Sequence, residues 1–404
     1  MKGSAIVVGG GPAGYSAALR LRRGGMDVTL IEKDDLGGTC VNRGCIPTRS
    51  YLQSIKVRDQ MRCCITDESS SLCLRPQAMR RQAEAKIQKL SFGIEYVLRK
   101  SKVSVEKGEV CRIGDRSVEL SDGRRLECDV LLIATGSAAK VPTGWDGCRI
   151  FDGEELLTLK NLPDSITVVG AGVFGTEMSV ILRALGVQVR LIEKEQSILP
   201  GWDEDIRRTM ENYLRAEGIE IACGETEKQN SGNVVFCCGR EPVFPCPVEQ
   251  TEENRQWIFV IGDASGGPMT ADRAMAEGRA TAERILGIGK TPQLGPSARC
   301  IFTPLEAATT GCTAGPGLRE GYVETGNTAS GGIFNCFRGF VKAVVEEKTH
   351  IIRGFHIVSF AASEIIQIGQ MAAAQEMTAE AFCSMVFPHP TEGELLQDAV
   401  RRAL

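Results

Sequence analysis

The 404-residue sequence lacks several features that would place it in other classes of protein. No apolar run approaches the roughly 20 residues that a membrane-spanning helix needs. Lysine and arginine are spread along the chain without a basic block and the net charge is −4, so no pattern typical of nucleic-acid binding is present. Met1-Lys2-Gly3 leads almost directly into an apolar run, which leaves no room for a signal or transit peptide. We therefore expect a cytoplasmic protein whose partners are small molecules or other proteins.

Histidine is scarce, with three residues, whereas cysteine is abundant, with sixteen. Disulfide scaffolds are typical of short secreted chains, so in a chain of this length most cysteines are expected to be free thiols. Neither Cys63-Cys64 nor Cys237-Cys238 is followed by a second cysteine pair or a histidine at zinc-ligand spacing. No metal site is expected.

A glycine-rich turn lies between an apolar run and an alanine-rich segment near the N-terminus. In the stretch 5–33, Gly9 permits a tight turn, Gly11 lets the backbone approach a pyrophosphate, and Gly14 lets a helix lie against the strand. A second apolar run ends at Glu32, 18 residues after Gly14, where a carboxylate can accept hydrogen bonds from a ribose. One such turn is a weak signal, because a simple packing turn has the same composition.

The same pattern returns over residues 166–194. Gly170, Gly172 and Gly175 are followed by Glu193, again 18 residues after the third glycine. Two copies with an acid at equal offset predict two dinucleotide-binding domains.

Three later apolar runs complete these two units. Residues 130–134, followed by Thr135-Gly136, close the first unit, and 234–239 resemble a poorer copy that closes the second. The run 257–261 ends in Gly262-Asp263 ahead of a helix expected from about 270 to 286. An acid between a strand and a helix N-terminus is well placed to hold a flavin's ribityl hydroxyl or phosphate, although an ordinary turn Asp fits the same pattern.

Two cysteines follow the first ribose-binding acid closely. In Gly37-Gly38-Thr39-Cys40-Val41-Asn42-Arg43-Gly44-Cys45-Ile46-Pro47, the thiols lie five positions apart at the predicted start of a helix. Such thiols can close a disulfide with little rearrangement, and the positive helix end stabilises a thiolate. Among sixteen cysteines, a chance pair is the alternative interpretation.

This segment, GGTCVNRGCIP, resembles the redox motif of the class I pyridine nucleotide-disulfide oxidoreductases. The resemblance extends over nearly the whole chain, through both glycine turns, the Ala134-Thr135-Gly136 segment, Gly262-Asp263 and the C-terminal region. It implies an α/β protein with two three-layer Rossmann-like domains, for FAD and NAD, and an α+β C-terminal dimerisation domain. The expected boundaries are 1–149 for the FAD domain with the redox disulfide, 150–261 for a shortened NAD domain, 262–298 for a return to the FAD or central domain, and 299–404 for the interface domain.

The resemblance also implies which residues contact each cofactor. For a tightly bound FAD these are Gly9, Gly11, Pro12, Ala13, Gly14, Glu32, Lys33, Gly38, Thr39, Thr135, Gly136, Asp263, Met269 and Ala271. For NAD they are Gly170, Gly172, Val173, Phe174, Gly175, Glu193 and Gly239.

The C-terminal sequence Phe387-Pro388-His389-Pro390-Thr391-Glu392-Gly393-Glu394 is similar to the family's His-Glu dyad. By this resemblance, Glu394 orients His389, whose imidazole exchanges a proton with a dithiol. The dyad reaches the disulfide of the other subunit in the family, which implies an obligate homodimer.

The acid at the end of the second pattern favours the dihydrolipoamide dehydrogenase branch. Glu193 suits the free 2′-hydroxyl of NAD, whereas NADP would require basic groups there. The implied reaction is FAD-dependent oxidation of dihydrolipoamide or a lipoylated protein, with Cys40 as the interchange thiol and Cys45 as the thiolate next to the flavin. A 2-oxoacid dehydrogenase or glycine cleavage complex is an expected partner. Two alternatives remain: a flavin-dependent NAD(P)H reductase of another disulfide or electron acceptor, and a redox sensor or complex subunit with little turnover.

The sequence departs from the family pattern at several positions. The second nucleotide-binding unit is short on both sides of the run 234–239. After this run, prolines at 242, 245 and 247 favour a loop. In the family, a lysine pairs with a glutamate near the flavin. Arg49 stands at the position of that lysine, and Glu177 matches the glutamate. Asp272 and Cys238 also differ from the expected residues, without an assigned consequence.

Overall fold

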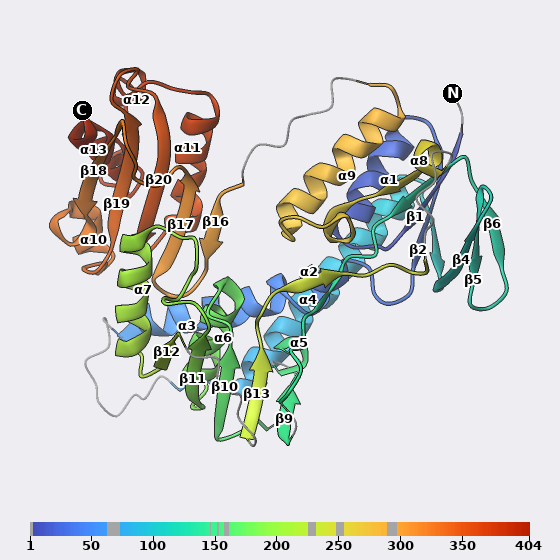
Figure 1. Cartoon of the computed structure of the whole chain (residues 1–404), viewed down its shortest axis with the longest axis horizontal. Coiled ribbons are helices and arrows are strands. Elements are labelled where there is room, and N and C mark those ends of the chain that lie inside the picture. The colour runs from blue at the N-terminus through green and yellow to red at the C-terminus, as the bar shows by residue number, and fades with distance from the viewer. Residues whose placement is uncertain are drawn as a thin grey trace. The chain divides into compact units, whose positions relative to one another are not determined.

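The computed structural model describes residues 3–62, 73–145, 147–151, 153–156, 161–224, 232–247, 254–288 and 297–404. Cys63-Cys64 lie outside this set. The chain divides into two compact units (Figure 1). The first comprises Met1–Ser50, Gln77–Val141 and Gly239–Leu294, and the second comprises Tyr51–Pro76, Pro142–Cys238 and Gly295–Leu404.

A five-stranded parallel sheet forms the centre of the first unit. Its order is β15-β7-β1-β2-β3, made of β15 (Ile258–Val260), β7 (Val130–Ile133), β1 (Ser4–Val8), β2 (Asp27–Glu32) and β3 (Ser104–Lys107). The central strands are runs of apolar, largely β-branched residues, as expected for strands that are covered on both faces. Helices α1 (Pro12–Arg23) and α9 (Ala271–Ile285) pack together beside this sheet and bury Val7, Leu21 and Leu30.

The rest of the first unit combines short strands with further helices. A three-stranded antiparallel sheet contains β4 (Val110–Gly114), β5 (Ser117–Leu120) and β6 (Arg125–Glu127), and β8 (Ser137–Ala139) pairs with β14 (Arg240–Pro242). The helices are α2 (Gly38–Asn42), α4 (Pro76–Lys100), α8 (Asn254–Trp257) and the 3-10 turn η1 (Gly262–Ser265), while α3 (Cys45–Arg62) contributes residues to both units. The expectation of a loop at Pro242 is wrong: Pro242 ends β14, at the tip of a two-stranded ribbon where a missing amide donor is tolerated. Trp257, expected in a strand, ends α8 instead.

The second unit contains its own parallel sheet, in the order β12-β11-β10-β13-β9. These strands are β12 (Glu220–Cys223), β11 (Gln188–Glu193), β10 (Ser165–Val169), β13 (Gly232–Phe236) and β9 (Cys148–Phe151), accompanied by α5 (Gly153–Leu156), α6 (Val173–Ala184) and α7 (Glu204–Ala216). β13 pairs in register with β10. The shortened sequence therefore still forms the parallel sheet of a nucleotide-binding domain.

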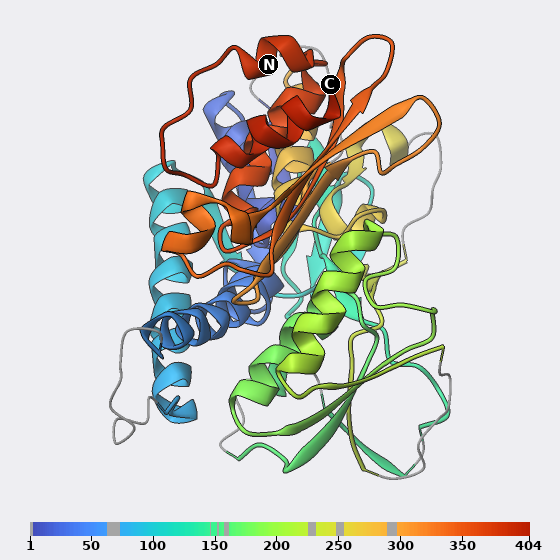
Figure 2. The same ribbon diagram turned by 90° about the vertical axis from the view of Figure 1, so that its left-hand side faces the viewer.

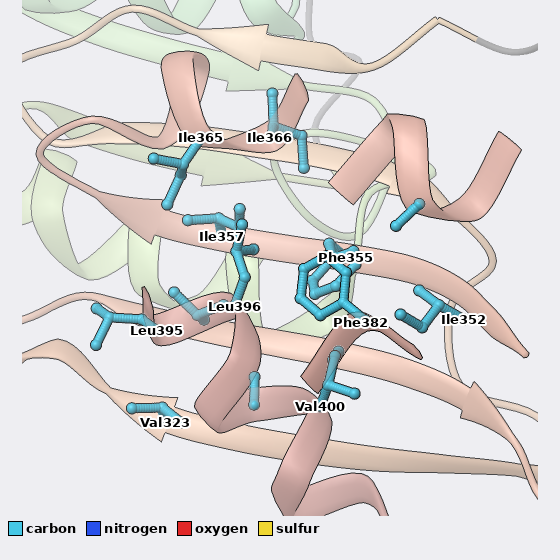
Figure 3. Close-up of a cluster of buried hydrophobic side chains, with 14 of the residues drawn as sticks. Val323, Ile352, Phe355, Ile357, Ile365, Ile366, Phe382, Leu395, Leu396 and Val400 are labelled. Atoms are coloured by element: carbon cyan, nitrogen blue, oxygen red, sulfur yellow. The ribbon is translucent and has the colours of Figure 1, made fainter. Parts of the chain in front are cut away.

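The C-terminal part of the second unit is an antiparallel sheet with helices on one face (Figure 2). The strand order is β16-β17-β20-β19-β18, made of β16 (Arg299–Ile301), β17 (Glu306–Gly311), β20 (Ile352–Ser359), β19 (Phe340–Glu346) and β18 (Leu318–Glu324). The helices are α10 (Ala329–Ile333), α11 (Ala362–Ala374), α12 (Ala379–Cys383) and α13 (Glu394–Ala403), with a 3-10 turn η2 (Thr325–Asn327). Figure 3 shows Phe355 and Phe382 at the centre of the apolar layer between sheet and helices. The predicted fold class is confirmed.

A buried lysine joins the antiparallel sheet of the second unit to helix α7. Lys342 on β19 lies 2.7 Å from Asp203 and 2.7 Å from Asp205, and its side chain is only 5% exposed. Asp203 is the N-cap of α7 and accepts the amide hydrogens of Asp205 and Ile206 through Oδ1. Burial alone would lower the pKa of Lys342, but its hydrogen bonds to the two aspartates raise that pKa above its ordinary value.

Candidate active site

The first glycine loop has the geometry that the sequence predicts. Gly9 has φ of 105°, and a Cβ on Gly14 would lie 1.8 Å from the carbonyl oxygen of Gly9. Glu32, at the end of β2, accepts the amide hydrogens of Gly10 (2.6 Å) and Asp34 (2.8 Å). The carboxylate is therefore fixed beside the loop and the N-terminus of α1, where the ribose and phosphates of a dinucleotide bind.

The remaining FAD positions surround this loop within the first unit. Pro12 and Ala13 begin α1, Lys33 follows β2 and pairs with Glu109, Gly38 and Thr39 begin α2, Thr135 and Gly136 follow β7, and Met269 and Ala271 lead into α9. Asp263 in η1 accepts a hydrogen bond from Ser137 Oγ (2.6 Å), which orients its carboxylate. Side chains added at Gly136, Gly266 or Gly267 would meet open space. This set of donors, the acid and the narrow glycine loop fit a flavin dinucleotide.

The two thiols lie on neighbouring helices and interact directly. Cys40 is in the middle of α2, whereas Cys45 begins α3, so only the second thiol occupies the expected helix start. The segment is tied to the first glycine loop, because the amide of Gly37 donates to the carbonyl oxygen of Gly10 (2.9 Å). Asn42 donates to the carbonyl oxygen of Gly38 (3.0 Å) and fixes the short helix.

The thiol pair is electrostatically asymmetric. The hydrogen bond that the Cys40 thiol donates lowers the pKa of Cys45, and Arg49 adds to this effect, whereas burial opposes it. The same hydrogen bond, together with burial, raises the pKa of Cys40. These opposite shifts favour Cys45 as the thiolate of the reduced pair and Cys40 as the thiol that holds the proton.

The second glycine loop repeats the contacts of the first. Glu193, at the end of β11, accepts the amide hydrogens of Ala171 (2.7 Å) and Glu195 (3.1 Å). A Cβ on Gly175 would lie 1.9 Å from the carbonyl oxygen of Gly170. Of the other predicted NAD positions, Gly172, Val173 and Phe174 lie at the start of α6. Gly239 follows Cys238 ahead of β14 and belongs to the first unit.

Two alanine substitutions in this second loop are expected to separate folding from binding. Gly172→Ala meets no neighbour within 4 Å, so the melting temperature should stay near wild type while NADH affinity falls by at least about tenfold, because the methyl group occupies the path of the pyrophosphate. Gly175→Ala clashes with backbone and should lower both the melting temperature and the affinity. Calorimetric titration with NADH and thermal unfolding measure the two effects. Equal NADH affinity in Gly172→Ala and wild type would contradict this assignment.

His389 and Glu394 form the predicted pair. His389 Nδ1 lies 2.9 Å from Glu394 Oε2, the imidazole is 72% exposed, and the amide of Thr391 donates to Glu394 Oε1 (3.1 Å). Glu394 is also the first residue of α13. A carboxylate on Nδ1 leaves Nε2 as the proton-exchanging atom.

Arg49 and Glu177 belong to different units. Glu177 is buried on α6, where its carboxylate accepts the amide hydrogen of Phe302 (2.9 Å). Their predicted pairing stays a prediction.

The sequence interpretation missed a second His-Glu pair and the role of the third histidine. His350 Nδ1 contacts Glu380 on the surface. His356 is fully buried between Thr309 (2.8 Å) and the carbonyl oxygen of Cys312 (3.0 Å), and burial lowers its pKa. These pairs have no short sequence motif, since their members lie 30 to 47 residues apart.

Two features are absent from the part of the chain that the structure describes. No group of three or more His, Cys, Asp or Glu side chains there could hold a metal ion. No helix in the same ranges is long and apolar enough to cross a membrane.

Two dinucleotide loops, an asymmetric dithiol next to the first, and a His-Glu dyad define a flavin- and nicotinamide-linked thiol-disulfide oxidoreductase. Comparison with known proteins agrees. Residues 3–240 match the family described as pyridine nucleotide-disulphide oxidoreductase, and residues 297–400 match the dimerisation domain of that family. The chain belongs to this family and is an NAD-linked disulfide oxidoreductase with FAD as its flavin, and the second match supports a homodimer.

Two relatives are about 30% identical to this chain. It is 30% identical over 455 residues to a dihydrolipoyl dehydrogenase of Chlorobaculum parvum, covering 98% of this chain and 96% of that protein. It is 31% identical to a dihydrolipoyl dehydrogenase of Bacillus subtilis, covering 98% and 97%. The first alignment is longer than the chain itself, so gaps must fall within this sequence.

Solved structures share the fold at lower identity. A Cu(II) complex of the HOCl-induced flavoprotein disulfide reductase RclA from Escherichia coli superposes with a TM-score of 0.87 at 22% identity, covering 99% of each chain. LpdA from Mycobacterium tuberculosis gives 0.86 at 23% identity, also covering 99% of each. These likenesses establish the fold.

Proposed function

We propose that this protein oxidises dihydrolipoamide, or a lipoyl group carried on a protein, and delivers the electrons to NAD. The observation that carries the proposal is the thiol pair on the segment tied to the first glycine loop, where the hydrogen bond from Cys40 lowers the pKa of Cys45 and so favours a protonated Cys40 and a Cys45 thiolate. Those are the states that an interchange thiol and a flavin-facing thiolate require. The identity of the Chlorobaculum and Bacillus relatives supports the lipoyl substrate.

In the proposed reaction, each residue moves a proton or exchanges a sulfur bond. The partner subunit's His389 accepts a proton from the dithiol substrate, and the resulting substrate thiolate attacks Cys40 of the oxidised Cys40-Cys45 disulfide. The bond between Cys40 and Cys45 breaks as the mixed disulfide forms, which leaves Cys45 as thiolate. The second substrate thiol then attacks the substrate sulfur of the mixed disulfide, the bond to Cys40 breaks, and the proton of that thiol passes to Cys40. FAD, when bound, supplies the two-electron carrier between Cys45 and NAD.

Glu193 supports NAD as the acceptor. Its buried carboxylate sits at the end of β11, where a nicotinamide dinucleotide presents its adenosine ribose, and a 2′-phosphate there would meet a negative charge. Lys194 is turned toward Glu195 (3.6 Å). We therefore expect a preference for NAD over NADP.

The proposal includes the setting of the enzyme. We propose the domain division 1–149, 150–261, 262–298 and 299–404, with each active site completed across a homodimer. A lipoyl-bearing component of a 2-oxoacid dehydrogenase or glycine cleavage system is the proposed protein partner. A reducing cytoplasm suits the sixteen cysteines.

The test mixes the flavin-loaded protein anaerobically with dihydrolipoamide and NAD and follows NADH absorbance. NADH formation that disappears in Cys45→Ser supports the proposal. Flavin reduction without NADH would retain the dithiol half of the reaction and replace NAD by another acceptor. No flavin reduction by dihydrolipoamide would instead favour another disulfide or electron acceptor, and the same samples then test NADH as the donor.

A further inference from the structure

The loop between His389 and Glu394 contains a second carboxyl group, Glu392, that the proposed chemistry does not use. Glu392 is only 5% exposed. Its Oε2 accepts hydrogen bonds from Ser359 Oγ (2.8 Å) and from the amide of Ala361 (3.0 Å), which lie in the turn between β20 and α11. Its Oε1 is buried and has no hydrogen-bond partner among the residues that the structure describes. Glu392 thus fastens the loop of the dyad to this turn with half of its carboxyl group unsatisfied.

The same turn is held by a second buried carboxylate and one lysine. Glu306 on β17 accepts the amide hydrogen of Ser363 (3.0 Å) and pairs with Lys56 on α3 (2.7 Å). Lys56 also donates to the carbonyl oxygen of Phe360. One ammonium group therefore serves two buried carboxyl groups, and it is already paired with Glu306.

The groups that face Glu392 come from four places in the fold. They are Lys56 of α3, Glu306 of β17, Ser359 with the Ala361 amide, and the thiol of Cys336 after α10. Burial raises the pKa of Glu392 and Glu306 adds to that rise, whereas the hydrogen bonds from Ser359 and Ala361 and the charge of Lys56 oppose it. The unpartnered Oε1 is consistent with a neutral group, because an ionised oxygen buried without a donor costs much more than a neutral one.

We propose that Glu392 is a positioning residue for His389. As a neutral acid, Glu392 holds the loop 389–394 onto the turn 359–363, and it releases that loop when it ionises. An ionised Glu392 carries part of its charge on Oε1, which accepts no hydrogen bond within the described part of the chain, and the attraction of Lys56 is shared with the carboxylate of Glu306, to which Lys56 is already paired. Water can hydrate this oxygen only if the loop lifts, and the loop carries both His389 and Glu394. Proton loss at Glu392 thus disorders the dyad, although Glu392 touches no substrate.

The experiment compares wild type, Glu392→Gln and Glu380→Gln as dimeric, flavin-loaded proteins. Reduction of the flavin by dithiothreitol is followed by stopped flow from about pH 6 to about pH 10. This probe rests on the proposed thiol-disulfide function but not on a lipoyl substrate. Glu380→Gln is the matched control, because the same change removes an ionisable carboxyl group at the surface, where Glu380 pairs with His350.

Wild type and Glu380→Gln should lose about tenfold in rate on the alkaline side, and Glu392→Gln should not, because an amide cannot ionise. An equal loss of the flavin-reduction rate at alkaline pH in all three proteins would overturn the proposal. Infrared difference spectra provide a readout that needs no turnover: wild type at neutral pH should show the carbonyl band of a protonated carboxyl group that Glu392→Gln removes. Absence of that band would also overturn it, whereas a band without any flavin reduction would count against the proposed function alone.

Discussion

Replacing Cys45 by serine is expected to lower the rate of dihydrolipoamide oxidation by at least about a thousandfold, because a hydroxyl group neither forms the disulfide nor holds a thiolate charge at neutral pH. The protein should still bind flavin, since Cys45 begins α3 and none of the contacts of the first glycine loop depend on its sulfur. Stopped-flow reduction of the flavin measures the effect directly. A Cys45→Ser protein that turns over like wild type would show that the electrons bypass this dithiol.

Cys40→Ala is the matched variant that tests the asymmetry of the pair. Without the hydrogen bond from Cys40, the pKa of Cys45 should rise toward its ordinary value. Alkylation of Cys45 by iodoacetamide in the reduced protein should therefore require a higher pH than in wild type, because only the thiolate reacts. If the alkylation profile of Cys45 were unchanged, Arg49 or another positive group would have to account for the lowered pKa.

Lys342→Met is expected to lower the free energy of unfolding by about 3 to 5 kcal/mol, the usual cost of leaving one partner of a buried ion pair alone. Asp203 would keep its α7 cap but lose the ammonium group 2.7 Å away, at a position where its side chain is 3% exposed. Urea denaturation near neutral pH measures the difference. Lys348→Met is the control, because Lys348 is an exposed lysine close in sequence, and its substitution should change little.

The pH dependence of this effect has a definite sign. The pKa of Lys342 is raised above 10.5 in the folded protein, so its contribution is complete below that pH and is lost only as the pH rises through the folded value. The difference between wild type and Lys342→Met should thus stay constant from mildly acidic to mildly alkaline pH. A difference that fell between these limits would mean that Lys342 is not the group that stabilises the cluster.

Short-range sequence patterns predicted the two glycine loops well. In each loop the chemistry is set by residues within about one β-α-β unit, and backbone sterics allow little besides glycine at positions such as 14 and 175. The His389-Glu394 pair was equally accessible, because its members lie five residues apart. The ends of the short elements at Trp257 and Pro242 were harder to predict, because such elements depend on which neighbouring segments pair with them.

Long-range polar contacts could not be predicted from the sequence. Nothing near Lys342 in the chain indicates that Asp203, 139 positions away, shares its pocket. The burial of Glu392 is similarly invisible, because an acid in a proline-rich loop is usually exposed. These contacts arise only when separate sheets and helices close around one another.

The bonding of Glu193 has a thermodynamic consequence. Two backbone amides of its own chain already hold this carboxylate, as two hold Glu32 in the first loop. The entropy lost in arranging the acid is therefore lost during folding rather than when the dinucleotide arrives, which favours affinity in the assembled protein. A substitution of Glu193 should lower both the stability of the empty domain and its affinity for the dinucleotide, whereas a substitution of Gly172 should lower the affinity alone.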